Sequence, residues 1–216
     1  MQRVKRHSEQ VQHLRLAITP MLGPSLITPI MKMFHEMQQR FPGGDFEIFE
    51  CRLNDIPGRL MDGTAEFAMV NLDESHFLDF QRLPLYQLPI RAYMSRRNPL
   101  AALAPLRFDQ IKDEPLITST VTSVVRKTID NWFAAHGCTP KFKQHFSQMS
   151  TIQELVKNDM GIILSHCNIG GEGTEIVSVP LEECVEISVG LLWNGEQAMS
   201  NFAMQMVERL KKIKLS

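Results

Sequence analysis

Hydroxyl-bearing residues gather where two predicted strands give way to predicted helices. Thr118, Ser119 and Thr120 end one extended apolar stretch, and Thr19 ends another. The first turn of a helix carries free backbone N–H donors and a partial positive charge, which together suit a carboxylate or another small anion. The two clusters therefore predict an anion-binding site, although Thr19 could equally act as a helix N-cap and the second cluster could combine capping with a polar strand.

Six further residues complete the set of candidate ligand contacts. They lie at turns that follow predicted strands or precede predicted helices: Pro20, Met21, Asn71, Met149, Ser150 and His166. Ser150 is also predicted as the N-cap of the helix that follows it, because its hydroxyl can accept a hydrogen bond from a free backbone N–H. A lone histidine at a strand end, such as His166, more often forms a hydrogen bond in the wall of a site than a bond to a ligand.

Motifs for catalysis, metal binding or phosphate binding cannot be placed on this sequence. The GGEG stretch at 170–173 lacks the Lys-Ser/Thr that ends a P-loop, and no G-x-S-x-G or H-E-x-x-H motif occurs. No two cysteines form a C-x-x-C pair, and structural burial explains them better than redox chemistry does. These are Cys51, Cys138, Cys167 and Cys184. We therefore expect no enzymatic activity, no cofactor and no metal ion.

The spacing of apolar residues predicts the elements that would position these side chains. In the first part of the chain we expect strands at 14–18, 46–51 and 66–70, and helices at 22–40 and 53–62. This β-α-β-α-β order favours a parallel sheet covered by helices. We then expect extended stretches within 79–95, a helical turn at 107–112 and a strand at 114–120.

A second series of similar size follows. It consists of helices at 123–136 and 151–160, strands at 142–146 and 162–166, extended stretches at 176–179 and 185–193, and a last helix at 197–213. We therefore predict an α/β fold of two lobes: 14–117 with 186–216 as lobe I, and 118–185 as lobe II. Because open α/β sheets bind ligands at the carboxyl ends of their strands, a cleft between the lobes is the expected site.

Composition restricts the class of protein further. The 216 residues carry a formal net charge of -1, so no global field attracts nucleic acid. The N-terminal stretch MQRVKRHSEQVQ is charged and does not read as a signal peptide, and no apolar run approaches the roughly 18 residues of a membrane-spanning helix. We expect a cytoplasmic protein with reduced thiols and no membrane partner.

Four stretches, in order and spacing, resemble the effector-binding domain of LysR-type transcriptional regulators over nearly the whole chain. The stretches are LRLAITPMLGPSLITPIMKMFHEMQQRFP, LNDIPGRLMDGTAEFAMV, SRRNPLAALAPLRFDQIKDEPLIT and FAAHGCTPKFKQHFSQMSTIQELVKNDMGIILSH. The family pattern differs at three points: Asn98 replaces a usual histidine, Asn158-Asp159-Met160-Gly161 replaces a run of small residues, and Ser165-His166 replaces Leu-Pro.

The resemblance implies two Rossmann-like lobes with a hinge, like type 2 periplasmic binding proteins. It implies a small-molecule effector, bound by the turns at Thr19 and Thr118, and a homodimer that becomes a tetramer in the full-length protein. DNA would be bound only through a winged helix-turn-helix domain preceding this segment, and residues 1–12 would be the end of the linker helix. The peroxide-sensing members carry cysteines around the first helix of lobe II, and here the stretch from Ser119 to Asn131 holds none.

Two other classes share this bilobed fold. A stand-alone solute-binding protein would need an export signal, and an enzyme would need a catalytic constellation, neither of which the sequence provides.

Overall fold

The structure is a computed structural model, and it describes residues 12–19, 23–41, 43–72, 77–118, 124–146, 148–170, 173, 175–196 and 199–212. The chain divides into two compact units. Unit 1 comprises Met1–Val70, Ser75–Leu85 and Gly190–Ser216, and unit 2 comprises Asn71–Glu74 and Tyr86–Val189.

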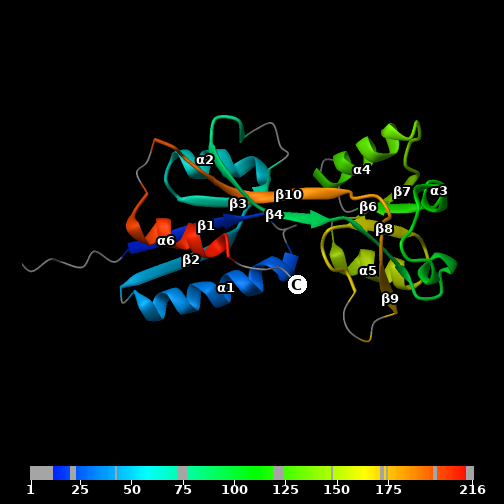
Figure 1. Cartoon of the computed structure of the whole chain (residues 1–216), viewed down its shortest axis with the longest axis horizontal. Coiled ribbons are helices and arrows are strands. Elements are labelled where there is room, and N and C mark those ends of the chain that lie inside the picture. The colour runs from blue at the N-terminus through cyan, green and yellow to red at the C-terminus, as the bar shows by residue number, and fades with distance from the viewer. Residues whose placement is uncertain are drawn as a thin grey trace, which may run out of the picture. The chain divides into compact units, whose positions relative to one another are not determined.

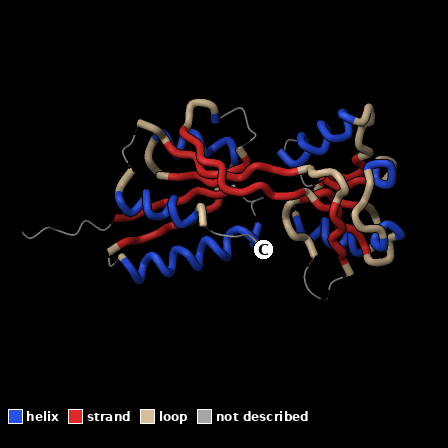
Figure 2. The backbone as a smooth tube through the Cα atoms, viewed as in Figure 1, coloured by secondary structure: helices blue, strands red, loops and turns tan. Residues whose placement is uncertain are grey.

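Unit 1 is built on a sheet with the strand order β2-β1-β3-β10-β4. Strand β1 pairs in parallel with both β2 and β3, as the β-α-β-α-β pattern predicts. The strands are β1 (Gln12–Ile18), β2 (Gly44–Glu50), β3 (Phe67–Asn71), β4 (Gln81–Pro89) and β10 (Glu186–Trp193). Figures 1 and 2 show helices on both sides of this sheet.

Aromatic packing fixes which helices of unit 1 cover which face of the sheet. Phe46 of β2 stacks on Phe34 of α1 (Gly23–Arg40), with ring centroids 4.2 Å apart, and lies 4.6 Å from Phe202 of α6 (Asn201–Leu210). Phe49, three residues further along β2, faces the opposite side of the sheet. The guanidinium carbon of Arg59, from α2 (Ile56–Met61), lies over its ring, 5.3 Å from the ring centroid. Helices α1 and α6 therefore share one face, and α2 covers the other (Figure 1).

Unit 2 is built on a second sheet with the strand order β7-β6-β8-β5-β9. Strand β6 is parallel to β7 and β8, whereas β5 is antiparallel to β8 and β9. The strands are β5 (Arg91–Ser95), β6 (Leu116–Thr118), β7 (Phe142–His145), β8 (Ile162–Ser165) and β9 (Ile176–Pro180). The helices are η4 (Pro99–Ala102), α3 (Phe108–Ile111), α4 (Val124–Ala135) and α5 (Met149–Lys157).

The cores of unit 2 follow the predicted apolar stripes. The apolar stripe of α4 is buried, at Val124, Val125, Ile129, Trp132 and Phe133. On α5, Ile152 and Val156 are fully buried against Ile117 of β6 and Ile163 of β8, within one apolar cluster. Helix α5 is thereby held beside the ends of β6 and β8.

The boundary that we expected between the lobes differs from the division in the structure. Residues 86–117, placed in lobe I by the sequence analysis, belong to unit 2, because β5 pairs with β8 and β9 and β6 pairs with β7 and β8. Strands β4 and β10 each have residues in both units. Helix α6 lies in unit 1, where the sequence analysis placed the last helix, and most of the proposed linker segment 1–12 is outside the described residues.

Two helix starts also differ from prediction. Helix α5 begins at Met149 with Gln148 as its N-cap, so Ser150 is inside the helix and is not the cap. Helix α6 begins at Asn201 rather than near 197, where Ser200 Oγ accepts a hydrogen bond of 3.1 Å from the Ala203 N–H. Between β5 and α3 the chain forms the short helix η4, capped by Asn98.

Gly161 is the position where backbone conformation most restricts the side chain. It has φ +153°, and a Cβ atom there would lie 2.8 Å from the Pro115 carbonyl oxygen. We expect Gly161→Ala to lower the free energy of unfolding by roughly 1–3 kcal/mol, because the residue would be both strained and crowded.

Gly58 provides the matched control. It lies within α2, and a Cβ there would meet nothing within 4 Å. Gly58→Ala should raise the free energy of unfolding by about 0.4–1 kcal/mol, since alanine restricts the unfolded chain. Urea denaturation of both variants measures the difference, and equal stability of the two would contradict the assignment of strain to Gly161.

Candidate functional site

Buried polar side chains in the described part of the chain lie at the carboxyl ends of strands. Five polar residues are buried, and each is the last residue of a strand or the residue after it. They are Thr19 after β1, Asn71 of β3, Ser95 of β5, Thr118 of β6 and Ser165 of β8. Three of the five are residues that the sequence analysis selected as ligand contacts.

In unit 2, parallel pairing brings two of these residues to the same edge of the sheet. Leu116 of β6 pairs with Ile162 of β8, and Ile117 pairs with Ile163. Thr118 is one residue beyond the second pair and Ser165 is two residues beyond it, so both lie at the same edge of the sheet. Thr118 is 6% exposed, and its carbonyl accepts a 3.2 Å hydrogen bond from the Phe146 N–H. Ser119 and Thr120, which continue the predicted cluster, lie outside the described residues.

Helix α5 begins close to this edge, after β7. Met149, its first residue, is partly buried and packs against the apolar cluster of unit 2, while Ser150 is exposed. Met149 therefore has a packing role that the sequence alone did not show. The first-turn N–H groups of α5 face outward along the helix axis in any α-helix, because no preceding turn accepts them.

The segment after β8 holds the predicted residue His166. Its Nε2 atom lies 3.4 Å from Sγ of Cys167, and Oγ of the preceding Ser165 accepts a 3.0 Å hydrogen bond from the Cys167 N–H. His166 is half-buried, whereas Ser165 and Cys167 are buried. Ser165 is thus a candidate that the sequence analysis missed; its neighbour His166 was the nearest signal.

The sheet of unit 1 presents two polar residues at the corresponding edge of its parallel strands. Ile18 of β1 pairs with Met69 of β3, so Thr19 and Asn71 lie one and two residues beyond that pair. Thr19 is 8% exposed, and its turn partners Pro20 and Met21 lie outside the described residues. Asn71 is the last residue of β3 and belongs to unit 2, although β3 is part of the sheet of unit 1, so the chain passes from one unit to the other at this point.

Asn71 carries an unusual feature for a buried side chain. It is 7% exposed, and its Oδ1 atom has no hydrogen-bond partner among the described residues. A buried acceptor that lacks a partner costs about 1–3 kcal/mol, so natural proteins rarely keep one without a reason. An external donor would satisfy it.

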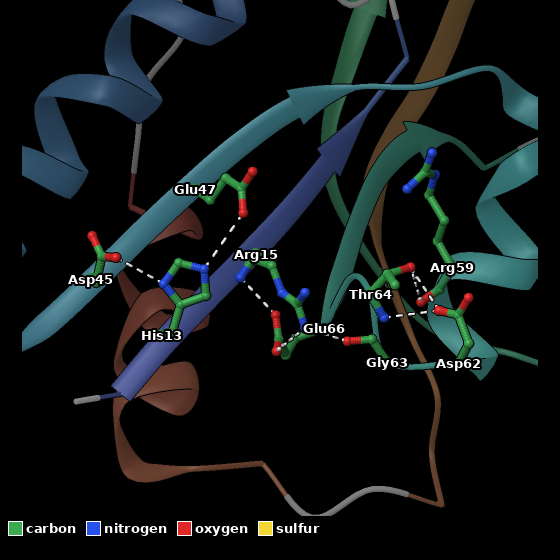
Figure 3. A network of polar contacts seen from close by, with 9 residues as sticks. All are labelled: His13, Arg15, Asp45, Glu47, Arg59, Asp62, Gly63, Thr64 and Glu66. Atoms are coloured by element: carbon green, nitrogen blue, oxygen red, sulfur yellow. Dashed lines mark hydrogen bonds and ion pairs between the residues drawn. The ribbon is translucent and has the colours of Figure 1, made fainter. Parts of the chain in front are cut away.

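A second polar cluster in unit 1, drawn in Figure 3, has a structural explanation. His13 lies between two carboxylates, with Nδ1 2.8 Å from Asp45 Oδ2 and Nε2 3.5 Å from Glu47 Oε2. All three side chains are exposed by 43% or more, so the pairs stabilise the sheet only weakly. Within the described residues, no group of three or more His, Cys, Asp or Glu side chains is placed to hold a metal ion.

The other half of the same network ties strand β1 to the loop before β3. The Arg15 N–H donates to Glu66 Oε2 at 2.6 Å, and Arg15 Nη2 donates to the Gly63 carbonyl. Hydrogen bonds donated by the hydroxyl and N–H of Thr64 hold the pKa of Asp62 below its ordinary value. The groups named here pair with one another within the fold, although Nε of Arg15 is buried without a hydrogen-bond partner among the described residues. We assign no ligand to the network.

Comparison with known proteins identifies the family. A family model described as the LysR substrate binding domain matches residues 7–213. This chain belongs to the LysR substrate-binding domain family. A curated relative, the uncharacterized HTH-type transcriptional regulator YwbI of Bacillus subtilis strain 168, is 21% identical over 202 residues. That alignment covers 92% of this chain and 66% of YwbI, so the chain spans just under two thirds of that relative.

Solved structures show the same fold. The regulatory domain of CcmR from Synechocystis PCC6803, solved in complex with 2-PG, superposes with a TM-score of 0.77 at 18% identity, over 93% of this chain and 96% of that one. The effector-binding domain of QuiR in complex with shikimate superposes with a TM-score of 0.76 at 17% identity, over 93% and 95%. These likenesses confirm the predicted α/β fold of two Rossmann-like lobes. No helix among the described residues has the length and apolar character needed to cross a membrane.

The cysteines of this LysR domain differ in exposure, which corrects the expectation that all are buried. Cys51 and Cys167 are buried, Cys138 is half-buried and Cys184 is exposed. Burial raises the pKa of the Cys167 thiol to about 11, although the hydrogen bond with Ser165 opposes this shift. A thiol of this pKa is about one part in a thousand thiolate at pH 8, which makes it a poor nucleophile.

We therefore expect Cys167 to be the slowest thiol to react with iodoacetamide in the folded protein at pH 8. Cys184 should react sooner because it is exposed, even though its hydrogen bond with Glu186 raises its pKa. Mass spectrometry of quenched, digested samples measures both rates, and urea-unfolded protein supplies the control in which both thiols react alike. Labelling of Cys167 as fast as Cys184 in the native protein would contradict its burial.

Proposed function

We propose that this domain senses a small organic anion and that it transmits the binding to DNA-binding domains of a transcription regulator. The observation that carries the proposal is the placement of buried polar side chains at the carboxyl ends of parallel strands, Thr19 and Asn71 on β1 and β3, and Thr118 and Ser165 on β6 and β8. Open α/β sheets bind ligands at these ends. The complexes of CcmR with 2-PG and of QuiR with shikimate support a small molecule as the effector.

The charge of the effector follows from the donors near Thr118. Helix α5 has nine residues, and its N-terminus follows β7 in unit 2. Its first-turn N–H groups and the positive end of its dipole favour a carboxylate or phosphate. Thr118, Ser119, Thr120 and Ser150 add hydroxyl donors. We retain Thr19, Pro20 and Met21, which follow β1, as proposed effector contacts.

Asn71 adds a requirement for a hydrogen-bond donor on the effector. Its Oδ1 atom is an acceptor, and an anionic group cannot satisfy it. A hydroxyl or an amine on the same molecule can. We therefore propose a small hydroxy- or amino-substituted acid rather than a simple carboxylate. His166, half-buried beside Ser165, is proposed as a wall residue of the site.

The proposed output is a shift in population between conformations. An effector that binds one conformation of the domain more tightly shifts the equilibrium towards it, by no more than the difference in the two affinities. A homodimer would carry this change to the DNA-binding domains. Met31 on α1, 50% exposed, is available for such a contact, whereas Met37 on the same helix is fully buried and is not.

Thr118 is the first test of the site. We expect Thr118→Val to weaken effector binding by about 0.5–2 kcal/mol, which is the contribution of one hydrogen bond. Thr128→Val on α4 is the matched control and should leave the affinity unchanged. Isothermal titration calorimetry with a panel of small hydroxy acids measures both, with urea denaturation to confirm folding. Unaltered affinity in Thr118→Val for an acid that binds the wild type would remove Thr118 from the site.

Substitution of Asn71 should affect effector binding and stability differently. Because its Oδ1 atom is buried without a partner, Asn71→Leu should leave the free energy of unfolding of the ligand-free domain unchanged or raise it. The same substitution should weaken binding of the effector about tenfold or more, since the donor on the effector loses its acceptor. Calorimetry and thermal unfolding of the same sample provide the two values. A variant that is clearly destabilised but binds normally would show that Asn71 acts in the fold alone.

A further inference from the structure

A cavity of about 440 Å³, open to solvent at the surface, lies in unit 1 between helices α1 and α6, and none of the predicted effector residues lines it. The two helices cover the same face of the sheet (Figure 1). Phe34 of α1 and Phe202 of α6 both pack on Phe46 of β2. The residues that line the cavity are Pro29, Lys32, Met33, Glu36, Arg209 and Lys212.

The charges around this cavity do not balance. Three of the lining side chains are cationic and one is acidic. Arg209 Nη1 lies 3.6 Å from Glu36 Oε2, so that pair is loosely matched. The ammonium groups of Lys32 and Lys212 have no ion pair with a described residue. The cavity thus has an excess of two positive charges in a chain whose formal net charge is -1.

Stabilisation of the helix dipole explains only part of this pattern. Cations in the last turn of a helix interact favourably with its negative end, and Arg209 and Lys212 are at the end of α6. Lys32 is in the middle of α1 and gains nothing from that effect. Lys211, beside Lys212, forms a 2.6 Å ion pair with Glu208 and does not line the cavity. Lys32 and Lys212, in contrast, line the cavity and have no ion pair with a described residue.

The floor of the cavity is apolar. Met33 is 6% exposed and Pro29 is half-buried. Sites for small organic molecules combine an apolar lining with a few charged groups that fix orientation. We propose that this cavity is a second ligand site, for a small phosphorylated organic compound whose phosphate contacts Lys32, Arg209 and Lys212.

Phenyl phosphate is a suitable probe, with inorganic phosphate as the comparison. At constant ionic strength we expect saturable binding of phenyl phosphate, tighter than that of inorganic phosphate because the ring contacts Met33 and Pro29. Binding should weaken between pH 7.5 and pH 5.5, because the phosphate loses its second charge near pH 6. Lys32→Ala and Lys212→Ala should each raise the Kd for phenyl phosphate about three- to tenfold, as expected for the loss of one charge-assisted contact.

Lys211→Ala is the matched control, since it removes the same charge one residue away from the cavity. It should leave the Kd unchanged, and Thr118→Val should also leave it unchanged, which separates this site from the proposed effector site. The proposal is overturned if phenyl phosphate does not bind at up to about 10 mM, a concentration well above that of typical metabolite sites. It is equally overturned if Lys211→Ala weakens binding as much as Lys212→Ala does, since that would indicate attraction by general surface charge.

Discussion

Parallel hydrogen bonding between neighbouring strands determines where polar side chains can meet in this protein. In unit 1 it joins β1 to β2 and β3, and in unit 2 it joins β6 to β7 and β8. Parallel strands end at the same edge of a sheet, so residues far apart in sequence, such as Thr118 and Ser165, come together there. Ser95 shows the opposite case, because β5 runs antiparallel to β8 and ends at the other edge.

The same constraint separates packing from binding. In the central strands β3, β6 and β8, the side chains before the last residue are apolar and buried, as in the β8 residues Ile162 to Leu164. A polar group in that interior would need a partner inside the fold. At the strand ends the backbone leaves the sheet. Hydroxyl and amide side chains can be buried there beside backbone N–H groups that are not bonded to a neighbouring strand. At the end of β3, the Oδ1 atom of Asn71 is such a group, buried without a hydrogen-bond partner among the described residues.

Strands β4 and β10 give the two units a shared backbone connection. Each strand has residues in unit 1 and residues in unit 2, so a change within one unit can act on the other through the covalent backbone of these strands. A sensor needs such a path, because binding at one place must alter geometry at another. Membership of the LysR substrate-binding family agrees with that design, and the family match covers residues of both units.

The sequence by itself determined the local elements and their order. Apolar periodicity located α1, α4 and the parallel strands, and it selected Thr19, Asn71 and Thr118, because strand ends and turn residues are signalled by neighbours in the chain. Tertiary structure alone decided which sheet each strand joins. Residues 86–117 carry no local signal for pairing with β8 and β9, and the long-range hydrogen bonds of β5 place them in unit 2. The same is true of Ser165 and of the cations between α1 and α6, whose surroundings come from distant parts of the chain.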